Sequence, residues 1–541
     1  MKKLVSARLI SLFLAVLTAS CSSSGYWVPP SSPPTAAPAL AFLSEPTPPQ
    51  DAVTEPDEVD LPVLIPVIED IPEATPTFLP SPSPLPALLL DTATPEPAGL
   101  DISPILYYTQ AADTLPVIAI RFGVDAAEIT SPDPIPEKDF LNPGQLLVIP
   151  RRTANTTSSQ KILPDSEIVF SPSAIDFDIE AYVQAAGGRL STYKEWLKSS
   201  GVVSGAEVVK RVALENSINP RLLLALLEYH GNWVHGQPGT QTQKEFPLGL
   251  ANSSYKGLYH QLVWTVNQLS VGYYSWREGR LTDISFAGGV SARLAPELNA
   301  GSVALQYYFA QLYQHQSQQW VEALDLEAGL AALHVRMFGN PWERAQTVEP
   351  LFPPGIQQPP MILPFAKNWQ WGFTGGPHGA YGNVGSFAAL DFAPGSTEAG
   401  CVKSNAWTAA AASGLVVRSG NGVVAIDLDG DGYEQTGWVL FYLHISSDHR
   451  IPVGTWVDVG DPLGHPSCEG GMSTGTHLHI ARKYNGEWIP AYGPLPFNLG
   501  GWVAQAGEAA YKGTLTRDGV TVTACTCTSA ATRIIRTNSD P

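Results

Sequence analysis

The stretch Thr476-His477-Leu478-His479-Ile480 decides the fold of the C-terminal part of this chain. Apolar residues separate and flank the two histidines, a pattern typical of a β-strand. Because alternate residues of a strand point to the same face, we expect His477 and His479 to face one pocket. The sequence from 360 onward is rich in similar strand-like runs. It therefore predicts a β domain with a functional site on one face of a sheet.

Three more polar residues stand upstream among apolar residues or glycines, namely His378 after Gly375-Gly376-Pro377, Asp391 within Leu390-Asp391-Phe392, and His444 within Leu443-His444-Ile445. Catalytic zinc usually takes three protein ligands from His, Asp or Glu and keeps a fourth position for water. Two imidazoles and one carboxylate leave the ion a net positive charge, which lowers the pKa of the bound water. Together with the two histidines of the strand, these residues predict a zinc site.

The order His…Asp…His…His-x-His resembles the lysostaphin-type and β-lytic-type zinc metallopeptidases, which cut peptides of bacterial cell walls. The resemblance implies that the metal ligands are His378, Asp391 and His479 and that the catalytic pair is His444 and His477. Lysostaphin-like members have a shorter spacing between the first two ligands. The longer, glycine-rich insert between His378 and Asp391 is typical of the β-lytic-like branch.

For residues 360–505 the resemblance implies an all-β zinc metallopeptidase fold, and residues 506–541 are expected to be a C-terminal tail. Between two expected strands, Asp427-Leu428-Asp429-Gly430-Asp431-Gly432 fits the first half of a calcium loop. An EF-hand would have Glu where Trp438 stands, so the loop is not an EF-hand. Calcium bound by Asp427, Asp429 and Asp431 and a solvated Asp-Gly turn both stay open.

Four of the five cysteines lie after residue 400, namely Cys401, Cys468, Cys525 and Cys527. In an exported domain such cysteines form disulfides readily, and four cysteines allow three pairings. We favour Cys401–Cys468 because both residues flank expected active-site segments. A bridge between Cys525 and Cys527 would close a tight ring.

The first 21 residues predict a secretion signal, with basic residues before an apolar run from Leu9 to Leu17. The following Leu17-Thr18-Ala19-Ser20-Cys21 resembles a bacterial lipobox, which implies a lipid on Cys21. Ordinary signal cleavage with a free Cys21 is the alternative. Residues 22–100 hold nineteen prolines and eleven acidic residues without Lys or Arg, a composition that predicts a disordered, extended tether. The net charge of −19 argues against nucleic acid as a partner.

Residues 105–150 resemble a LysM module, a small βααβ unit that binds the glycan of peptidoglycan or chitin. Asp113 is the expected N-cap of a helix that ends at Gly123, and Pro143-Gly144 predicts a turn before a short strand. A structural βααβ unit that binds nothing is the alternative.

Residues 165–350 predict a central all-α domain, with a helix that starts at Asn219-Pro220. The stretch from Ile218 to Leu227 resembles the lysozyme-like domain of lytic transglycosylases. Where that family has its catalytic Glu and a Ser, this chain has His230-Gly231, so the domain is predicted to lack its catalytic acid. Glu228 is expected to point away from that position. Trp233, Tyr255 and Tyr259 are either sugar-stacking residues or core residues, as aromatics more often are.

The sequence as a whole predicts a multidomain zinc metalloendopeptidase that hydrolyses peptide bonds of peptidoglycan and is exported and anchored by lipid to the membrane. One alternative is an idle peptidase-like scaffold that recruits or activates another cell-wall hydrolase. The other is a glycan-cleaving enzyme acting through the central domain, which the His at position 230 disfavours.

Overall fold

The computed structural model describes residues 103–382, 384–527 and 529–540. The predicted signal, the predicted lipidation site Cys21 and the predicted tether of residues 22–100 lie outside the described residues. Within the described part of the chain, no helix has the length and apolar character needed to cross a membrane.

The first described unit is a two-stranded antiparallel sheet with short helical segments between its strands, namely β1 (Ile105–Tyr108), α1 (Leu115–Phe122), η1 (Ala126–Glu128) and β2 (Leu146–Ile149). The second helix of the expected βααβ order is thus one 3₁₀ turn. Gly123 ends α1 in the left-handed conformation, as predicted. The predicted N-cap at Asp113 is wrong: Thr114 caps the helix, because the Asp113 carboxylate accepts hydrogen bonds from Tyr107 and Arg121 instead.

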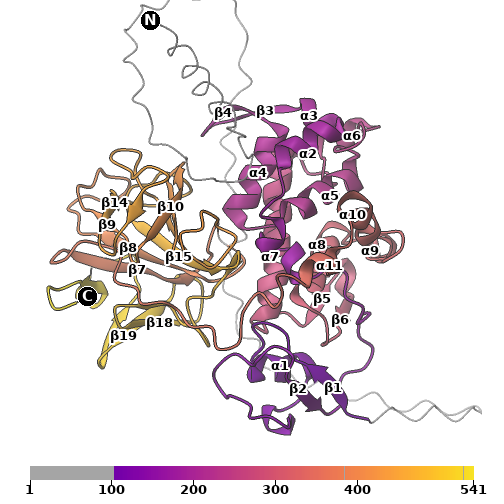
Figure 1. Ribbon diagram of the computed structural model, residues 1–541, viewed down its shortest axis with the longest axis horizontal. Helices are drawn as coiled ribbons and strands as arrows, with labels where there is room; N and C mark the ends of the chain where they lie inside the picture. Colours follow the sequence, from indigo (N-terminus) through magenta and orange to yellow (C-terminus); the bar gives the residue numbers. More distant parts are fainter. Residues whose placement is uncertain (1–102, 383, 528, 541) are drawn as a thin grey trace, which may run out of the picture. The chain divides into compact units, whose positions relative to one another are not determined.

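Helices dominate the following segment, where α4, α5, α7 and α8 are the longest (Figure 1). The helices are α2 (Ile179–Ala186), α3 (Arg189–Thr192), α4 (Gly205–Asn216), α5 (Pro220–Gly231), α6 (Gln241–Glu245), α7 (Leu258–Arg277), α8 (Ala300–Leu312), α9 (Ser317–Ala323), α10 (Leu330–Phe338) and α11 (Pro341–Ala345). The start of α5 is as predicted, since the Asn219 side chain accepts from the Arg221 amide and Pro220 occupies the first turn.

The expectation of an all-α central domain is wrong in one respect. Two short antiparallel hairpins interrupt the helices, β3 (Lys194–Leu197) with β4 (Gly201–Ser204), and β5 (Asp283–Ser285) with β6 (Ser291–Arg293). The first hairpin turns at Lys198-Ser199-Ser200, and Gly201, which begins β4, takes a φ of 72°. Left-handed φ values of this kind are readily adopted by glycine, so the turn chemistry permits a hairpin where helical periodicity was expected.

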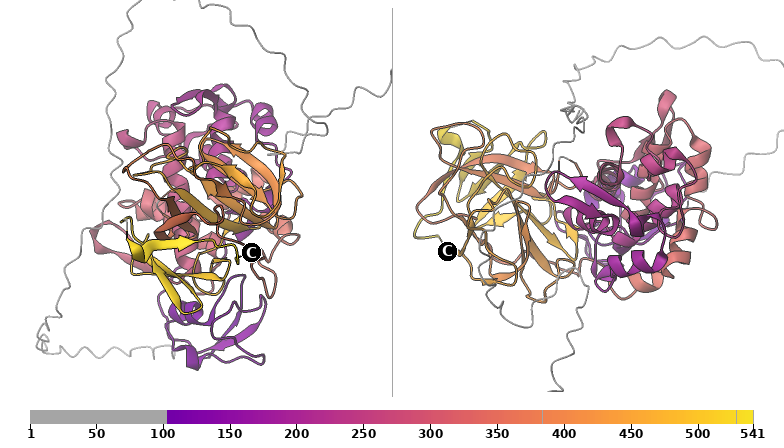
Figure 2. Two further views of the ribbon diagram at one scale, coloured as in Figure 1. Left: turned by 90° about the vertical axis from the view of Figure 1, so that its left-hand side faces the viewer. Right: turned by 90° about the horizontal axis from the view of Figure 1, so that it is seen from above.

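Strands take over after residue 370, and the helices and strands gather in separate parts of the fold (Figure 2). Nine strands form one antiparallel sheet in the order β13-β10-β11-β12-β15-β8-β7-β21, with β16 paired to β15. Its members are β7 (Gln370–His378), β8 (Ala389–Pro394), β10 (Gly414–Gly420), β11 (Val423–Asp427), β12 (Trp438–Leu443), β13 (Trp456–Val457), β15 (Leu478–Tyr484), β16 (Glu487–Trp488) and β21 (Arg533–Ile535). The strands expected at 414–417, 423–426 and 438–442 are confirmed.

A second, four-stranded sheet contains β17 (Asn498–Leu499), β18 (Trp502–Ala506), β19 (Gly513–Arg517) and β20 (Val520–Thr523), and a separate pair joins β9 (Thr408–Ala409) to β14 (Pro462–Gly464). The segment 506–541, which was expected to form a tail, is therefore folded in its described residues. Their β21 pairs with β7 of the large sheet and buries Ile534, so this segment completes the domain.

The two faces of the large sheet contribute to different cores. Leu440, Tyr442 and Ile480 belong to a cluster made of residues from the β part. Their neighbours Phe441 and Ala481 belong to the cluster that also holds the buried residues of the helices. His479 is two residues before Ala481, and so the predicted metal site lies on the face that shares its core with the helical part.

Candidate metal centre

Strand pairing brings two of the predicted ligands together directly. β8 and β15 are antiparallel neighbours, and in their register Asp391 lies opposite His479. His378 ends β7, the neighbour of β8 on its other side, where the register is interrupted before the histidine. Such irregularities redirect a side chain relative to a regular strand. The sheet therefore fixes three residues that are distant in sequence on adjacent strands.

Gly375, three residues before His378, leaves room for the carboxylate of Asp391. Gly375 is paired with Asp391, and a Cβ atom at Gly375 would lie 2.5 Å from Asp391 Oδ2. A Cβ at Gly376 would lie 2.6 Å from the backbone of Lys512. Contacts this short do not occur for real Cβ atoms, so both glycines are needed for close approach at the site.

The potential ligand atoms of His378, Asp391 and His479 converge on one point. Asp391 Oδ1 lies 3.2 Å from His378 Nε2 and 3.2 Å from His479 Nδ1, and these two nitrogens are 3.0 Å apart. The three residues are buried, with exposed fractions of 2%, 6% and 5%. Asp391 Oδ1 is buried and accepts no hydrogen bond.

In each of the two ligand histidines, the hydrogen bond made by the outer ring nitrogen determines whether the nitrogen facing the cluster carries a proton. His378 Nδ1 donates to the Gly376 carbonyl at 2.8 Å, and His479 Nε2 donates to the Ala380 carbonyl at 2.9 Å. Because a carbonyl only accepts, these contacts place the N–H of each neutral ring on its outer nitrogen and leave lone pairs on the two facing nitrogens. Two lone pairs and a carboxylate on one buried point repel one another unless a cation lies between them. This donor set fits a zinc ion, with the outer contacts that metal-binding histidines usually make.

His444 and His477 lie beside this cluster. Their ring centroids are 4.4 Å apart, and His477 Nε2 is 3.7 Å from Asp391 Oδ1. Each ring is also held by a carbonyl, since His444 Nδ1 donates to Glu469 O at 2.8 Å and His477 Nδ1 to Gly475 O at 2.8 Å. His444 takes a left-handed φ of 65°, which is rare for a residue with a side chain and is typical of functional sites.

The charges of the cluster shift its pKa values in different directions. Burial opposes ionisation of Asp391, but the neighbouring His378 and His479 outweigh it and hold the Asp391 pKa well below its usual range. Burial lowers the pKa of His378, but the charge of Asp391 and the hydrogen bonds to Asp391 and to the Gly376 carbonyl together outweigh burial, so the net shift is upward. Burial, His477 and His479 lower the pKa of His444 to about 3. A neutral His444 can accept a proton.

Tyr511, in the turn between β18 and β19, is part of the site and was not predicted. Its ring stacks on His378, with centroids 4.1 Å apart and planes 21° from parallel. Its amide donates to Pro377 O, and Gly376 donates to its carbonyl. Burial and the charge of Asp391 raise its pKa to about 12, so the phenol is neutral. It was missed because it lies in the segment that was expected to be a tail.

In the central segment, Glu228 and His230 make structural contacts. Glu228 Oε2 accepts from the amides of Val234 and His235 at 2.8 and 3.0 Å, and so it stabilises the turn after α5. His230 Nε2 lies 3.0 Å from the Tyr308 hydroxyl, and burial lowers its pKa to about 3. Trp233 is fully buried and belongs to the core, which excludes it as a stacking surface for sugar. Tyr255 and Tyr259 are half-buried.

Two disulfide bridges join the four cysteines, Cys401–Cys468 and Cys525–Cys527, and the first is the pairing that we favoured.

In the acidic loop the ligand atoms of Asp427, Asp429 and Asp431 are close enough to share an ion. The Asp427 carboxylate, however, accepts from the amides of Asp429 and Gly432. These hydrogen bonds are those of an Asp-Gly turn.

Comparison with known proteins bears on both parts of the chain. Residues 161–351 match the family model described as "LasA, N-terminal domain". Two curated relatives are named Protease LasA, from Pseudomonas aeruginosa strains UCBPP-PA14 and PAO1. The first is 26% identical over 357 residues, which cover 62% of this chain and 78% of the relative. The second is 27% identical over 359 residues, with the same coverage of 62% and 78%. Together they support a peptidase of the lysostaphin type.

Solved structures with similarity to this chain include a deep-sea M23 metalloprotease named pseudoalterin, at 24% identity and a TM-score of 0.26, covering 31% of this chain and 96% of that one. Helicobacter pylori Csd3 is 23% identical with a TM-score of 0.17, covering 25% and 33%. The family model that matches the helical segment is that of LasA, so the lytic-transglycosylase resemblance stays a prediction. The LysM resemblance of residues 105–150, which lie outside that match, also stays a prediction.

Proposed function

We propose that this protein is a zinc metalloendopeptidase that hydrolyses peptide bonds of bacterial peptidoglycan. The observation that carries the proposal is the convergence of His378 Nε2, His479 Nδ1 and Asp391 Oδ1 in a buried cluster whose outer ring nitrogens donate to backbone carbonyls. Zinc bound there would polarise the scissile carbonyl and lower the pKa of an attacking water.

His444 and His477 are assigned to proton transfer and to stabilisation of the oxyanion that develops on the scissile carbonyl. Both rings are fixed through Nδ1, so their Nε2 atoms are the ones available to substrate. The side chain of His477 is 17% exposed, and that of Asp391 is 9% exposed. His477 is therefore better placed to meet solvent and substrate than the ligand it adjoins.

Peptidoglycan as substrate rests on the lysostaphin-type resemblance, together with the similarity to proteases named LasA. The same proposal includes export and anchoring through a lipid on Cys21, with residues 22–100 as the tether. Mass spectrometry of the mature amino terminus tests the anchor. An unacylated Cys21, or an amino terminus elsewhere, would contradict it while leaving the peptidase assignment intact.

Product analysis of purified peptidoglycan tests the reaction. The wild-type protein should release new amino termini, and His477→Ala should lower that rate by about 10²- to 10⁴-fold, the usual contribution of general acid–base catalysis. Glu228→Gln should leave it nearly unchanged. Anhydro-sugar or reducing-end products that disappear in Glu228→Gln would instead assign the reaction to the central segment. Bound zinc without products of either kind would favour the recruiting scaffold.

A further inference from the structure

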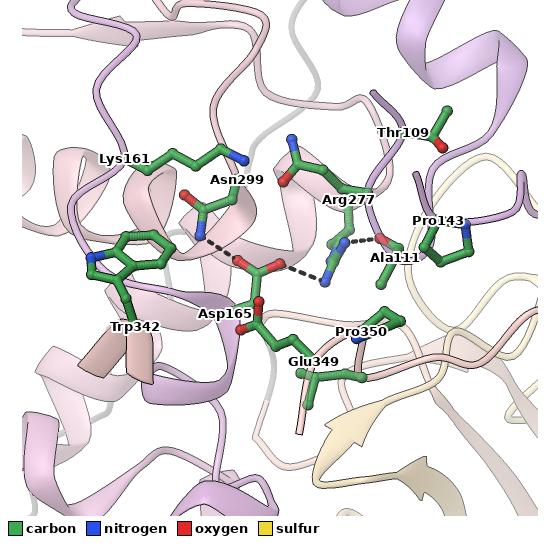
Figure 3. A pocket seen from close by; sticks show the side chains of 12 residues that line it. Thr109, Ala111, Pro143, Lys161, Asp165, Arg277, Asn299, Trp342, Glu349 and Pro350 are labelled. Carbon is green, nitrogen blue, oxygen red and sulfur yellow. Dashed lines mark hydrogen bonds and ion pairs between the residues drawn. The ribbon is translucent and has the colours of Figure 1, made fainter. Parts of the chain in front are cut away.

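A polar cavity of about 240 Å³ lies where residues 109–111 and 143 meet the helical segment (Figure 3). Its polar and aromatic lining includes Lys161, Asp165, Arg277, Asn299, Trp342 and Glu349. No residue of the metal centre lines it. The volume is below the roughly 300–1,000 Å³ of pockets for drug-sized ligands and equals about eight water volumes, so the cavity suits a small organic molecule.

Two of the four charged side chains in the cavity are already paired. Asp165 Oδ2 accepts from Arg277 Nη2 at 2.9 Å, and Asp165 Oδ1 accepts from Asn299 Nδ2 at 2.8 Å (Figure 3). Arg277 Nε also lies 3.1 Å from Glu487 Oε1 on β16. The guanidinium of Arg277 therefore already pairs with two buried carboxylates, those of Asp165 and Glu487. It does not neutralise a third carboxylate.

The other two charged groups are unpaired. The Glu349 carboxylate accepts the Ser166 amide at 2.8 Å but has no cation within ion-pair distance among the described residues. Lys161 likewise has no carboxylate within that distance in the described part of the chain, and its side chain is exposed. Figure 3 places the two on either side of the Asp165–Asn299 pair. Burial and the charge of Asp165 raise the pKa of Glu349 to about 7, as expected of a carboxylate without a counter-ion.

An aromatic wall completes the cavity. Trp342 is 37% exposed and lines the cavity together with Pro350 and Leu351. An indole face suits an aliphatic chain and attracts an ammonium group. The cavity thus offers an anionic point, a cationic point and an apolar surface in one lining.

We propose that this cavity binds a small zwitterion, a free amino acid or a short unblocked peptide, with its ammonium group at Glu349, its carboxylate at Lys161 and its side chain against Trp342. The site is separate from the metal centre, and the inference stands apart from the proposed peptidase activity. An ion alone would leave most of the volume and the Trp342 face unused.

Calorimetric titration of the full chain with matched probes tests this. L-alanine is used with the unaltered protein, and L-alanyl-L-alanine with a chain carrying Asp391→Ala, so that hydrolysis does not interfere. Saturable 1:1 binding of either probe is expected, and which of them binds distinguishes an amino acid from a peptide ligand. N-acetyl-L-alanyl-L-alanine and L-alanyl-L-alanine amide each lack one charge and should bind about 10- to 100-fold more weakly, the usual cost of losing a charged hydrogen bond.

Variants locate the site. Glu349→Gln and Lys161→Met should each weaken binding at least about tenfold. Glu343→Gln, which changes an exposed carboxylate of α11 outside the cavity lining, should not. Absence of saturable binding at millimolar probe, equal binding of blocked and unblocked probes, or equal binding of methylamine would overturn the proposal. If circular dichroism shows that Glu349→Gln does not fold, the binding of the blocked probes to the unaltered protein still tests the proposal.

Discussion

His378 and His479 are 101 residues apart in sequence, yet His378 Nε2 lies 3.0 Å from His479 Nδ1. Both rings donate their other N–H to backbone carbonyls, so this contact joins two lone pairs beside a buried carboxylate. Such an arrangement is costly in a protein interior without a cation, because buried acceptors without donors lose their hydration. The contact between these two residues is thus the strongest structural reason to expect a metal.

Tyr511 is predicted to support the metal through its stacking on His378. Tyr511→Ala should lower zinc affinity by about tenfold, at the low end of what outer-shell changes cost. Tyr511→Phe keeps the ring and should keep the affinity. Competition with a chromogenic chelator measures both. Equal affinities for the alanine and phenylalanine variants would mean that the ring does not orient the ligand.

The Cys401–Cys468 bridge is predicted to stabilise the segment that carries Gly400, whose carbonyl accepts the amide of Thr476. The bridge spans 67 residues, for which the chain-entropy relation gives a stabilisation of about 4 kcal/mol. Replacing both cysteines by serine should lower the free energy of unfolding by about that amount in urea titrations. The Cys525–Cys527 bridge joins residues with a sequence separation of only 2. Replacing these two cysteines by serine should therefore lower the free energy of unfolding much less. Equal losses would contradict the assignment.

A buried ion cluster should make the stability of the sheet depend on pH. Glu434 lies 2.6 Å from Arg418 Nε and 2.9 Å from Lys483 Nζ. Burial alone would raise the Glu434 pKa, but the two cations outweigh burial and lower it to about 2. Glu434→Gln removes the negative charge from two buried cations and should cost about 3–5 kcal/mol at neutral pH.

The sign follows from proton binding. The unfolded chain takes up a proton at Glu434 near pH 4.5, whereas the folded chain resists until about 2, so stability falls as the pH drops through that interval. The difference in unfolding free energy between wild type and Glu434→Gln should therefore shrink in acid. Urea titrations at neutral pH and below 4.5 measure it. A difference that stays constant or grows would show that Glu434 does not act as the charged partner.

The sequence revealed features that depend on local pattern. Alternation around His477 and His479 predicted their strand, and Asn219-Pro220 predicted the start of α5, because strand period and helix capping are encoded within a few residues. The disulfide at Cys401 was inferred from its position beside the same site.

Features that depend on distant pairing were not recovered. β21 has three residues and gains its place only by pairing with β7, so nothing local distinguishes it from a tail. Tyr511 reaches His378 for the same reason, through the turn that precedes β19. Asp113 looked like a cap, but a buried ion pair with Arg121 outweighed the local preference.

The measurement that tests the central claim most directly combines metal content with turnover on one preparation of His477→Ala. Zinc is measured per chain by mass spectrometry, and the release of amino termini from peptidoglycan is measured on the same sample. The account predicts that His477→Ala keeps about one zinc per chain and loses about 10²- to 10⁴-fold in rate, while Asp391→Ala loses both. Loss of zinc in His477→Ala with retention of zinc in Asp391→Ala would contradict the account. An unchanged rate in His477→Ala would also contradict it.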